Sequence, residues 1–523
     1  MEKLSGLDAS FLYFETAQTP MHVAGLTLYE VPEAQRGHVF EHFRDFFRTR
    51  AHLVPIFGKK LARTVLELDH PGWVDAGEID FDYHIKGHTL DAPGTLAQLE
   101  EWVALEHARP LDRSKPLWQF TVVDGLEGGR AALYSKVHHA AVDGGAGMAI
   151  TQAIYDLTPE PRKVAPPEPR ERGRVPSVPE RAVLGLHDMA ASMVSQQMKM
   201  LEAVPKVMGQ MAEMMAQVAD PQALTATRFI APKTPFNVTL GRRRTYAART
   251  LPLSGAKAIS KASGAKINEV VMAIVSGALR RYLKRHDALP QAPLIAFVPV
   301  SLRQPGDGDQ NNQVTGMNCP LATDIADPSD RLARIVDDSA RLKSVVGTFK
   351  DSSPKDYTLL GAPLLLPGLM RLYGGTKLAD VVPQAVNLTI SNTPGPPFPL
   401  FCNGAKVTNL YPVSIATHGV GLNVTVQSYL DNLDFGITAG RRAMPDIEDF
   451  AADLRASFEE LRDAVCGVAE PEADDPGRAP EPKRKPAAKP AAKPKTKARK
   501  PAAKANTKAT RSRSSDTSAA PSG

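Results

Sequence analysis

The chain has 523 residues, of which 63 are Lys or Arg and 57 are Asp or Glu, so its formal net charge is +6. Residues 483–523 hold 13 of the basic residues and a single acid, which leaves residues 1–482 with a net charge of −6. The excess of basic residues therefore belongs to a tail, and composition gives no support to a nucleic-acid-binding fold.

Cysteine usage and apolar runs exclude further classes of protein. The three cysteines stand far apart with no C-x-x-C pair, which argues against a disulfide framework and against a zinc site. The longest apolar stretch, residues 359–370, is interrupted by Pro363 and Pro367 and falls short of the roughly 18 residues of a membrane helix. Because the first 15 residues lack a continuous apolar core, we also expect no signal peptide.

Two predicted strands dominate the first part of the chain. Residues 118–124 and 131–138 are rich in β-formers and flank a turn with Gly and Asp, and residues 144–157 follow as a helix. Residues 159–179 are rich in Pro and charge and predict an extended linker.

The segment after this linker is rich in methionine. Residues 180–219 contain eight of the 15 methionines and predict a helix. Methionine adapts to varied apolar partners, so the helix suits either ordinary packing, which we favour, or contact with a lipid surface.

The second half alternates helices and strands. Helices are predicted at 268–285, with Asn268 as the cap, and at 327–346 and 447–465; strands are predicted at 294–302, 385–390, 406–410, 422–429 and 433–438. This alternation predicts an α/β fold with one sandwich in each half. The expected segments are a first half (1–158), a linker with a Met-rich helix (159–235), a second half (236–469) and a tail (470–523).

The tail combines an acidic collar with a run of Lys, Pro and Ala. It has almost no large apolar side chain and cannot offset its ordering entropy, so we expect it to be disordered. It suits electrostatic contact with an anionic membrane, or equally a solubilising role. Contact with nucleic acid is the less favoured reading of the same charge.

The sequence SKVHHAAVDGGAG, residues 135–147, places two histidines at the end of a strand. If the strand continues, His139 lies on its more apolar face, where burial favours the neutral, proton-accepting imidazole. His138 lies on the opposite face. A hydrogen-bonded pair of core histidines beside a tight turn is the structural alternative.

The spacing H-H-x-x-x-D-G resembles the active-site signature of the CoA-dependent acyltransferases. The flanking sequence is similar to that of the bacterial wax ester synthase/acyl-CoA:diacylglycerol acyltransferase family, in ordered blocks at residues 4–23, 111–118, 267–273, 299–303 and 387–407. Glu269 stands where that family usually has Asp. The long linker and the basic tail are additions to the family pattern.

The resemblance implies two CoA-dependent-acyltransferase-like sandwich domains and an O-acyltransferase. Such an enzyme moves a long-chain acyl group from acyl-CoA to diacylglycerol, with fatty alcohols as a second class of acceptor that would give wax esters. The thioester is already activated, so direct general-base catalysis suffices. No cofactor or metal is expected, and acyl-CoA is a co-substrate.

The resemblance also assigns roles to residues. His139 is the expected general base, His138 orients it, Asp143 supports the turn, and Gly144 keeps the entrance open. Weaker candidates for substrate contact are Asn268, Ser391 and Asn392, for which a helix cap and a strand-ending turn are the structural alternatives.

Two other functions compete with acyl transfer. A lipid hydrolase lacks support because the chain has no G-x-S-x-G motif. A non-catalytic protein that binds a lipid droplet or membrane surface is the main alternative. We expect a cytoplasmic protein that associates peripherally with the inner membrane or with lipid droplets through the Met-rich helix and the tail.

Overall fold

The computed structural model describes six stretches of the chain: residues 2–62, 70–142, 144–167, 230–301, 314–349 and 362–467. They belong to one unit, residues 1–469, and residues 470–523 form a second unit. Asp143, the Met-rich segment 180–219 and the tail all lie outside the described residues.

The first sheet carries the histidine pair. Among the described residues its strands are, in order across the sheet, β12 (Phe401–Cys402), β13 (Ala405–Val413), β2 (His22–Glu30), β7 (Arg130–His138), β6 (Trp118–Leu126) and β5 (Ile85–Thr89). Only the β5–β6 pairing is parallel. Most side chains of β7 are buried on both faces of the sheet, which explains why its sequence is so largely apolar.

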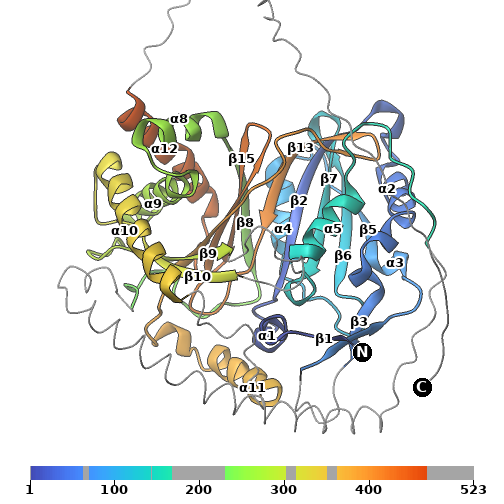
Figure 1. Cartoon of the computed structure of the whole chain (residues 1–523), viewed down its shortest axis with the longest axis horizontal. Coiled ribbons are helices and arrows are strands. Elements are labelled where there is room, and N and C mark those ends of the chain that lie inside the picture. Colours follow the sequence, from blue (N-terminus) through green and yellow to red (C-terminus); the bar gives the residue numbers. More distant parts are fainter. Residues whose placement is uncertain are drawn as a thin grey trace, which may run out of the picture. The chain divides into compact units, whose positions relative to one another are not determined.

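The second sheet lies beside the first. In the part of the chain that the structure describes, its strand order is β10 (Val314–Pro320), β9 (Ile295–Ser301), β11 (Leu388–Thr393), β14 (Leu422–Tyr429), β15 (Asn432–Gly440) and β8 (Arg244–Pro252). Figure 1 shows the helices of this half on the side of the sheet away from the first half. They are α8 (Leu253–Ser263), α9 (Ile267–Arg285), α10 (Pro328–Phe349) and α12 (Ile447–Cys466).

Helix α4 (Leu96–His107) lies between the two sheets, beside β2 on one side and β8 on the other (Figure 1). The helix begins with a capping box, in which Thr95 Oγ1 accepts the amide of Gln98 and Gln98 Oε1 accepts the amide of Thr95. Its apolar residues Leu99 and Val103 join a core cluster with side chains of both sheets. The helix therefore packs the halves together.

The remaining elements lie outside the two large sheets. The helices are α1 (Gly6–Phe14), α2 (Val39–Arg48), α3 (Phe81–His84), α5 (Gly144–Ile154) and α11 (Ala362–Gly375), and the last of these helices packs against the first. A small sheet contains β1 (Glu2–Lys3), β4 (Gly72–Asp75) and β3 (Lys59–Ala62). Short 3-10 turns are η1 (Glu33–Gln35), η2 (Ala51–Leu53), η3 (Pro55–Gly58), η5 (Glu127–Gly129), η6 (His139–Ala141) and η7 (Leu378–Asp380).

The expected α/β architecture is confirmed, and so is the type of most predicted elements. Two local expectations were wrong. Helix α9 begins at Ile267, because the Glu269 carboxylate accepts the Lys266 amide at 2.9 Å, and Asn268 is therefore its second residue instead of its cap. Ser391 and Asn392 lie within β11 instead of in a turn.

Strand β13 belongs to the second half of the sequence but pairs with β2 of the first sheet. The Asp434 carboxylate on β15 holds it there, accepting the amide of Leu410 at 2.8 Å and the side chains of Asn409 and Thr250. Asp434 is fully buried, and its pKa is raised by that burial. The second half thus completes the sheet that carries the histidine pair.

No helix among the described residues is long and apolar enough to cross a membrane.

Gly436 allows β13 to approach β15, because a Cβ at this position would collide with the carbonyl oxygen of Pro412. We expect Gly436→Ala to lower the free energy of unfolding by about 1–3 kcal/mol. Thermal unfolding followed by circular dichroism measures the loss. The matched control is Gly368→Ala in α11, where a Cβ meets nothing within 4 Å. Equal melting temperatures for the two variants would contradict the close approach.

Candidate active site

The histidine pair lies where β7 ends. His138 is the last residue of the strand, opposite His22 of β2, and its amide donates to the Leu117 carbonyl at 2.9 Å. His139 begins the 3-10 turn η6, so the expectation that the strand continues through it does not hold. Its amide donates to the Met21 carbonyl at 2.8 Å, which fixes the turn to the segment before β2.

His139 lies in a sheltered, largely apolar site. Its ring stacks on Phe11 of α1, with centroids 3.9 Å apart and planes inclined by 13°. Burial is the main cause that lowers the pKa of His139, to about 4. The imidazole is therefore neutral at physiological pH and can accept a proton, which is the state that a general base requires.

His138 is fully buried and acts on the turn. Its Nδ1 accepts the amide of Ala140 at 3.1 Å, so the ring proton lies on Nε2. That Nε2 faces the Glu15 carboxylate, with Oε1 3.5 Å away. These contacts hold the backbone that carries His139.

Glu15 and Arg113 complete this support, and sequence reasoning did not single them out. Glu15 accepts the amide of Met21 at 3.0 Å and the Nε–H of Arg113 at 2.8 Å, and Arg113 also donates to the Leu12 carbonyl at 2.7 Å. Burial alone would raise the pKa of Glu15, but its contacts with His138 and Arg113 lower it to about 2. Both residues lie in the blocks at 4–23 and 111–118, which was the signal available in the sequence.

A second set of buried, hydrogen-bonded polar side chains, centred on His107, lies beside β7. His107 Nδ1 accepts the hydroxyl of Tyr134 at 2.7 Å, and its Nε2 donates to the Ser414 carbonyl at 3.0 Å. Burial is the main cause that lowers the pKa of His107, to about 3. The His107 carbonyl in turn accepts Nε2 of His22 at 2.9 Å. This group links the end of α4 to the histidine strand and to the chain just after β13.

The other predicted site residues are dispersed. Gly144 is the first residue of α5, directly after the undescribed Asp143. Asn268, Ser391 and Asn392 are half-buried on α9 and β11 of the second half. Within the described residues, no hydrogen bond or ring contact joins these three to the histidine pair. Among the same residues, no group of three or more His, Cys, Asp or Glu side chains is suited to a metal ion.

The two-lobed fold and its buried histidine pair are those of a CoA-dependent type of acyltransferase. The structure is similar to the wax ester synthase/diacylglycerol acyltransferase from Marinobacter aquaeolei VT8, with a TM-score of 0.63 and 30% identity over 88% of this chain and 98% of that one. The starter condensation domain of rhizomide synthetase shares the fold alone, with a TM-score of 0.53 and 13% identity over 89% and 94% of the two chains.

Sequence comparison identifies the family. The wax ester synthase/diacylglycerol acyltransferase catalytic domain matches residues 4–271, and the WS/DGAT C-terminal domain matches residues 310–462. A Mycobacterium tuberculosis H37Rv protein named as a diacylglycerol O-acyltransferase is 35% identical over 88% of this chain and 100% of its own length. The O-acyltransferase WSD of Acinetobacter baylyi is 34% identical over 88% and 96%. The chain therefore belongs to the wax ester synthase/diacylglycerol acyltransferase family, which confirms the predicted family and enzyme class.

Substitution of Glu15 tests whether its charge positions the histidine pair. Glu15→Gln keeps the shape of the side chain but weakens its charged hydrogen bonds. We expect kcat to fall about tenfold to a hundredfold, with KM for acyl-CoA nearly unchanged. The control is Glu101→Gln, at an exposed position of α4. A variant with normal kcat, or with a raised KM alone, would show that Glu15 does not position the histidines.

The pH profile tests the environment of His139. Since only the neutral imidazole accepts a proton, kcat/KM should stay level from pH 7 to about pH 5 and fall with an apparent pKa near 4. An exposed histidine would give a limb near pH 6.5. Circular dichroism at each pH confirms that the chain is folded. An acid limb at pH 6–7 in folded protein would mean that His139 is solvated or is not the base.

Proposed function

We propose that the chain transfers a long-chain acyl group from acyl-CoA to diacylglycerol, forming triacylglycerol, and that it also acylates fatty alcohols to form wax esters. The observation that carries this proposal is the sheltered imidazole of His139, stacked on Phe11, in the family's histidine motif. The names of these relatives support both classes of acceptor. They give no support to the alternative of a non-catalytic lipid-binding protein.

The proposed reaction is a direct transfer. The imidazole of His139 takes the hydroxyl proton of the acceptor as its oxygen attacks the thioester carbonyl carbon. The resulting oxyanion collapses, the carbon–sulfur bond breaks, and the CoA thiolate leaves with the proton that the imidazolium returns. The enzyme ends in its starting state, so neither a covalent intermediate nor a cofactor is needed.

The remaining site residues keep the roles assigned to them as proposals. His138 orients the turn, Asp143 supports it, and Gly144 leaves space at the entrance. Asn268, Ser391 and Asn392 are proposed substrate contacts. Their support is that each is half-buried and makes no side-chain hydrogen bond within the described part of the chain, so its polar atoms stay available to a ligand.

Replacement of His139 tests the base. We expect His139→Ala to lower the transfer rate by about 10²–10⁴-fold, because the hydroxyl proton loses its acceptor. Purified protein with acyl-CoA and either diacylglycerol or a fatty alcohol, followed by thin-layer chromatography, measures each product. His38→Ala, at an exposed histidine, is the control. Near-normal activity of the His139 variant, or accumulation of an acyl-enzyme in the wild type, would contradict the mechanism.

We also propose peripheral contact with the inner membrane or a lipid droplet, on the cytoplasmic side. The Met-rich helix and basic tail that suggested it lie outside the described residues, but α11 supplies a third element. It exposes Leu365, Leu369 and Leu372 by 68%, 57% and 55%, with the exposed cations Arg371 and Lys377 beside them. Apolar side chains flanked by cations suit an anionic lipid surface.

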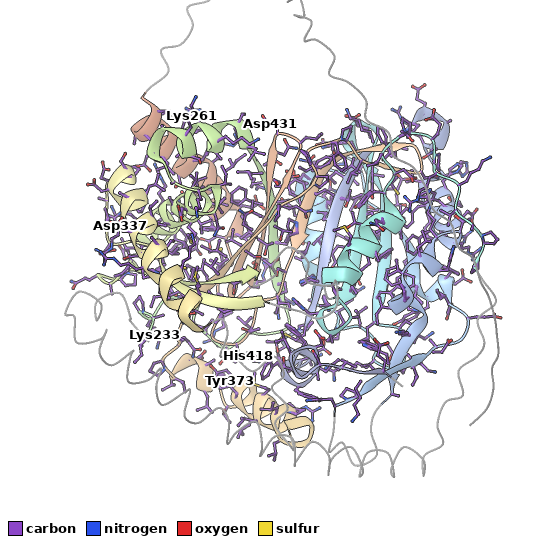
Figure 2. The ribbon with its side chains drawn as sticks, in the orientation of Figure 1. Lys233, Lys261, Asp337, Tyr373, His418 and Asp431 are labelled. Atoms are coloured by element: carbon purple, nitrogen blue, oxygen red, sulfur yellow. The ribbon has the colours of Figure 1, made fainter. Side chains whose placement is uncertain are left out.

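The opposite face of α11 is held by the protein. Tyr373 makes an edge contact with His418, with ring centroids 6.3 Å apart (Figure 2). A Cβ on Gly374 would collide with the same imidazole. The helix is therefore docked through this face, and its leucines remain exposed for lipid.

Flotation with vesicles tests this contact. We expect Leu365→Asp/Leu369→Asp to lose binding to neutral phosphatidylcholine vesicles that contain diacylglycerol, because charge replaces the apolar contact. Removal of residues 483–523 should weaken binding only to anionic vesicles, and added salt should mask its effect. Leu157→Asp, at a position 66% exposed, is the control. Unchanged flotation of the double variant would contradict the role of α11.

A further inference from the structure

A cavity of about 370 Å³ lies between the end of α4 and the start of β8. Four arginines line it. They are Arg109, just after α4, and the consecutive Arg242, Arg243 and Arg244 that lead into β8. Each half of the molecule supplies one wall. Ala17, in the segment before β2, also lines the cavity.

The cationic charge of this cavity is not balanced by protein carboxylates. Glu106 is 3.0 Å from Arg109, but it also pairs with Lys136 at 2.7 Å. Within the described residues, no ion pair joins Arg242, Arg243 or Arg244 to any carboxylate. The cluster therefore has an excess of positive charge concentrated in a concave site, which attracts anions.

Arg244 is the anchor of the cluster. It is only 5% exposed, and its guanidinium donates to the carbonyls of Gly241, at 2.8 Å, and of Gln18. Burial lowers the pKa of Arg244 to about 10, which leaves it charged at neutral pH. A buried cation that meets only carbonyl dipoles is costly for a folded protein, and an anion in the cavity would offset that cost.

The cavity and the catalytic turn share one segment. Ala17 lines the cavity and Gln18 accepts from Arg244, while Met21, three residues further on, holds the amide of His139. The opposite wall includes Ala104 and Ala108, on either side of His107, whose carbonyl accepts a hydrogen bond from His22 beside the histidine strand. The cavity therefore adjoins the site without being part of it.

We propose that this arginine cavity binds the phosphate groups of acyl-CoA, an inference that rests on the proposed function. Guanidinium groups match phosphate oxygens through paired hydrogen bonds. Acyl-CoA carries a diphosphate and a 3′-phosphate, and a long pantetheine arm separates both from the thioester. The phosphates can thus bind at the junction of the halves while the thioester reaches His139. Free phosphate and anionic lipid headgroups share this chemistry, and the experiment separates them.

The kinetic test compares acyl-CoA with acyl-3′-dephospho-CoA. We expect Arg242→Ala/Arg243→Ala to raise KM for acyl-CoA about tenfold or more with little change in kcat, and to reduce the preference for the 3′-phosphate. Both arginines are exposed, so their loss should leave the fold intact, whereas Arg244→Ala could unfold the chain. Lys261→Ala, on the exposed face of α8 (Figure 2), is the control.

Direct binding separates the sources of phosphate. Calorimetry with adenosine 3′,5′-bisphosphate should show binding to the wild type and to His139→Ala, and weakened binding to the arginine double variant. Inorganic phosphate binding as tightly, or loss of anionic-vesicle binding with an unchanged KM for acyl-CoA, would overturn the assignment. A wild type that binds the bisphosphate but does not transfer acyl groups would contradict the proposed function and leave this inference standing.

Discussion

The shielding of the His139 imidazole from water is the constraint around which the catalytic half is arranged. Burial favours the neutral form of His139, but a nearby free carboxylate would favour the cation. Glu15 is the carboxylate of this region, but it is not free, because it accepts hydrogen bonds from Arg113 and from the Met21 amide. It also lies 3.5 Å from Nε2 of His138, so its charge supports the geometry of the turn.

Local sequence predicted strands β6, β7, β9, β11 and β13–β15, helices α5, α9, α10 and α12, and the position of the histidine pair at the end of β7. It did not predict β2, β8 or α4. Alternating apolar residues determine a strand such as β7 within the span of the strand itself. The partners of His138 were not predictable in this way, because Glu15 and Arg113 are 98 residues apart and meet only in the fold. The start of α9 was predicted one residue too late for a local reason. The Glu269 carboxylate accepts the Lys266 amide, so the helix begins before Asn268.

The location of β13 was beyond prediction for a different reason. A run of β-forming residues predicts that a strand will form, but it does not predict which sheet that strand will join. Here the choice depends on Asp434 and Gly436, which act through contacts with Leu410 and Pro412 of a neighbouring strand. Asp434 and Gly436 thus join the two sheets, and α4 packs against both of these sheets.

That joint has a consequence for biosynthesis. Residues 405–413 leave the ribosome long after residues 22–30, with which they pair. Until then the nascent first sheet has β2 as an open edge, and the Ser414 carbonyl that holds His107 does not yet exist. A truncated or stalled chain would carry every residue of the histidine motif on an unfinished sheet. The sheet that carries the histidine motif is therefore complete only after residues 405–413 have been synthesised.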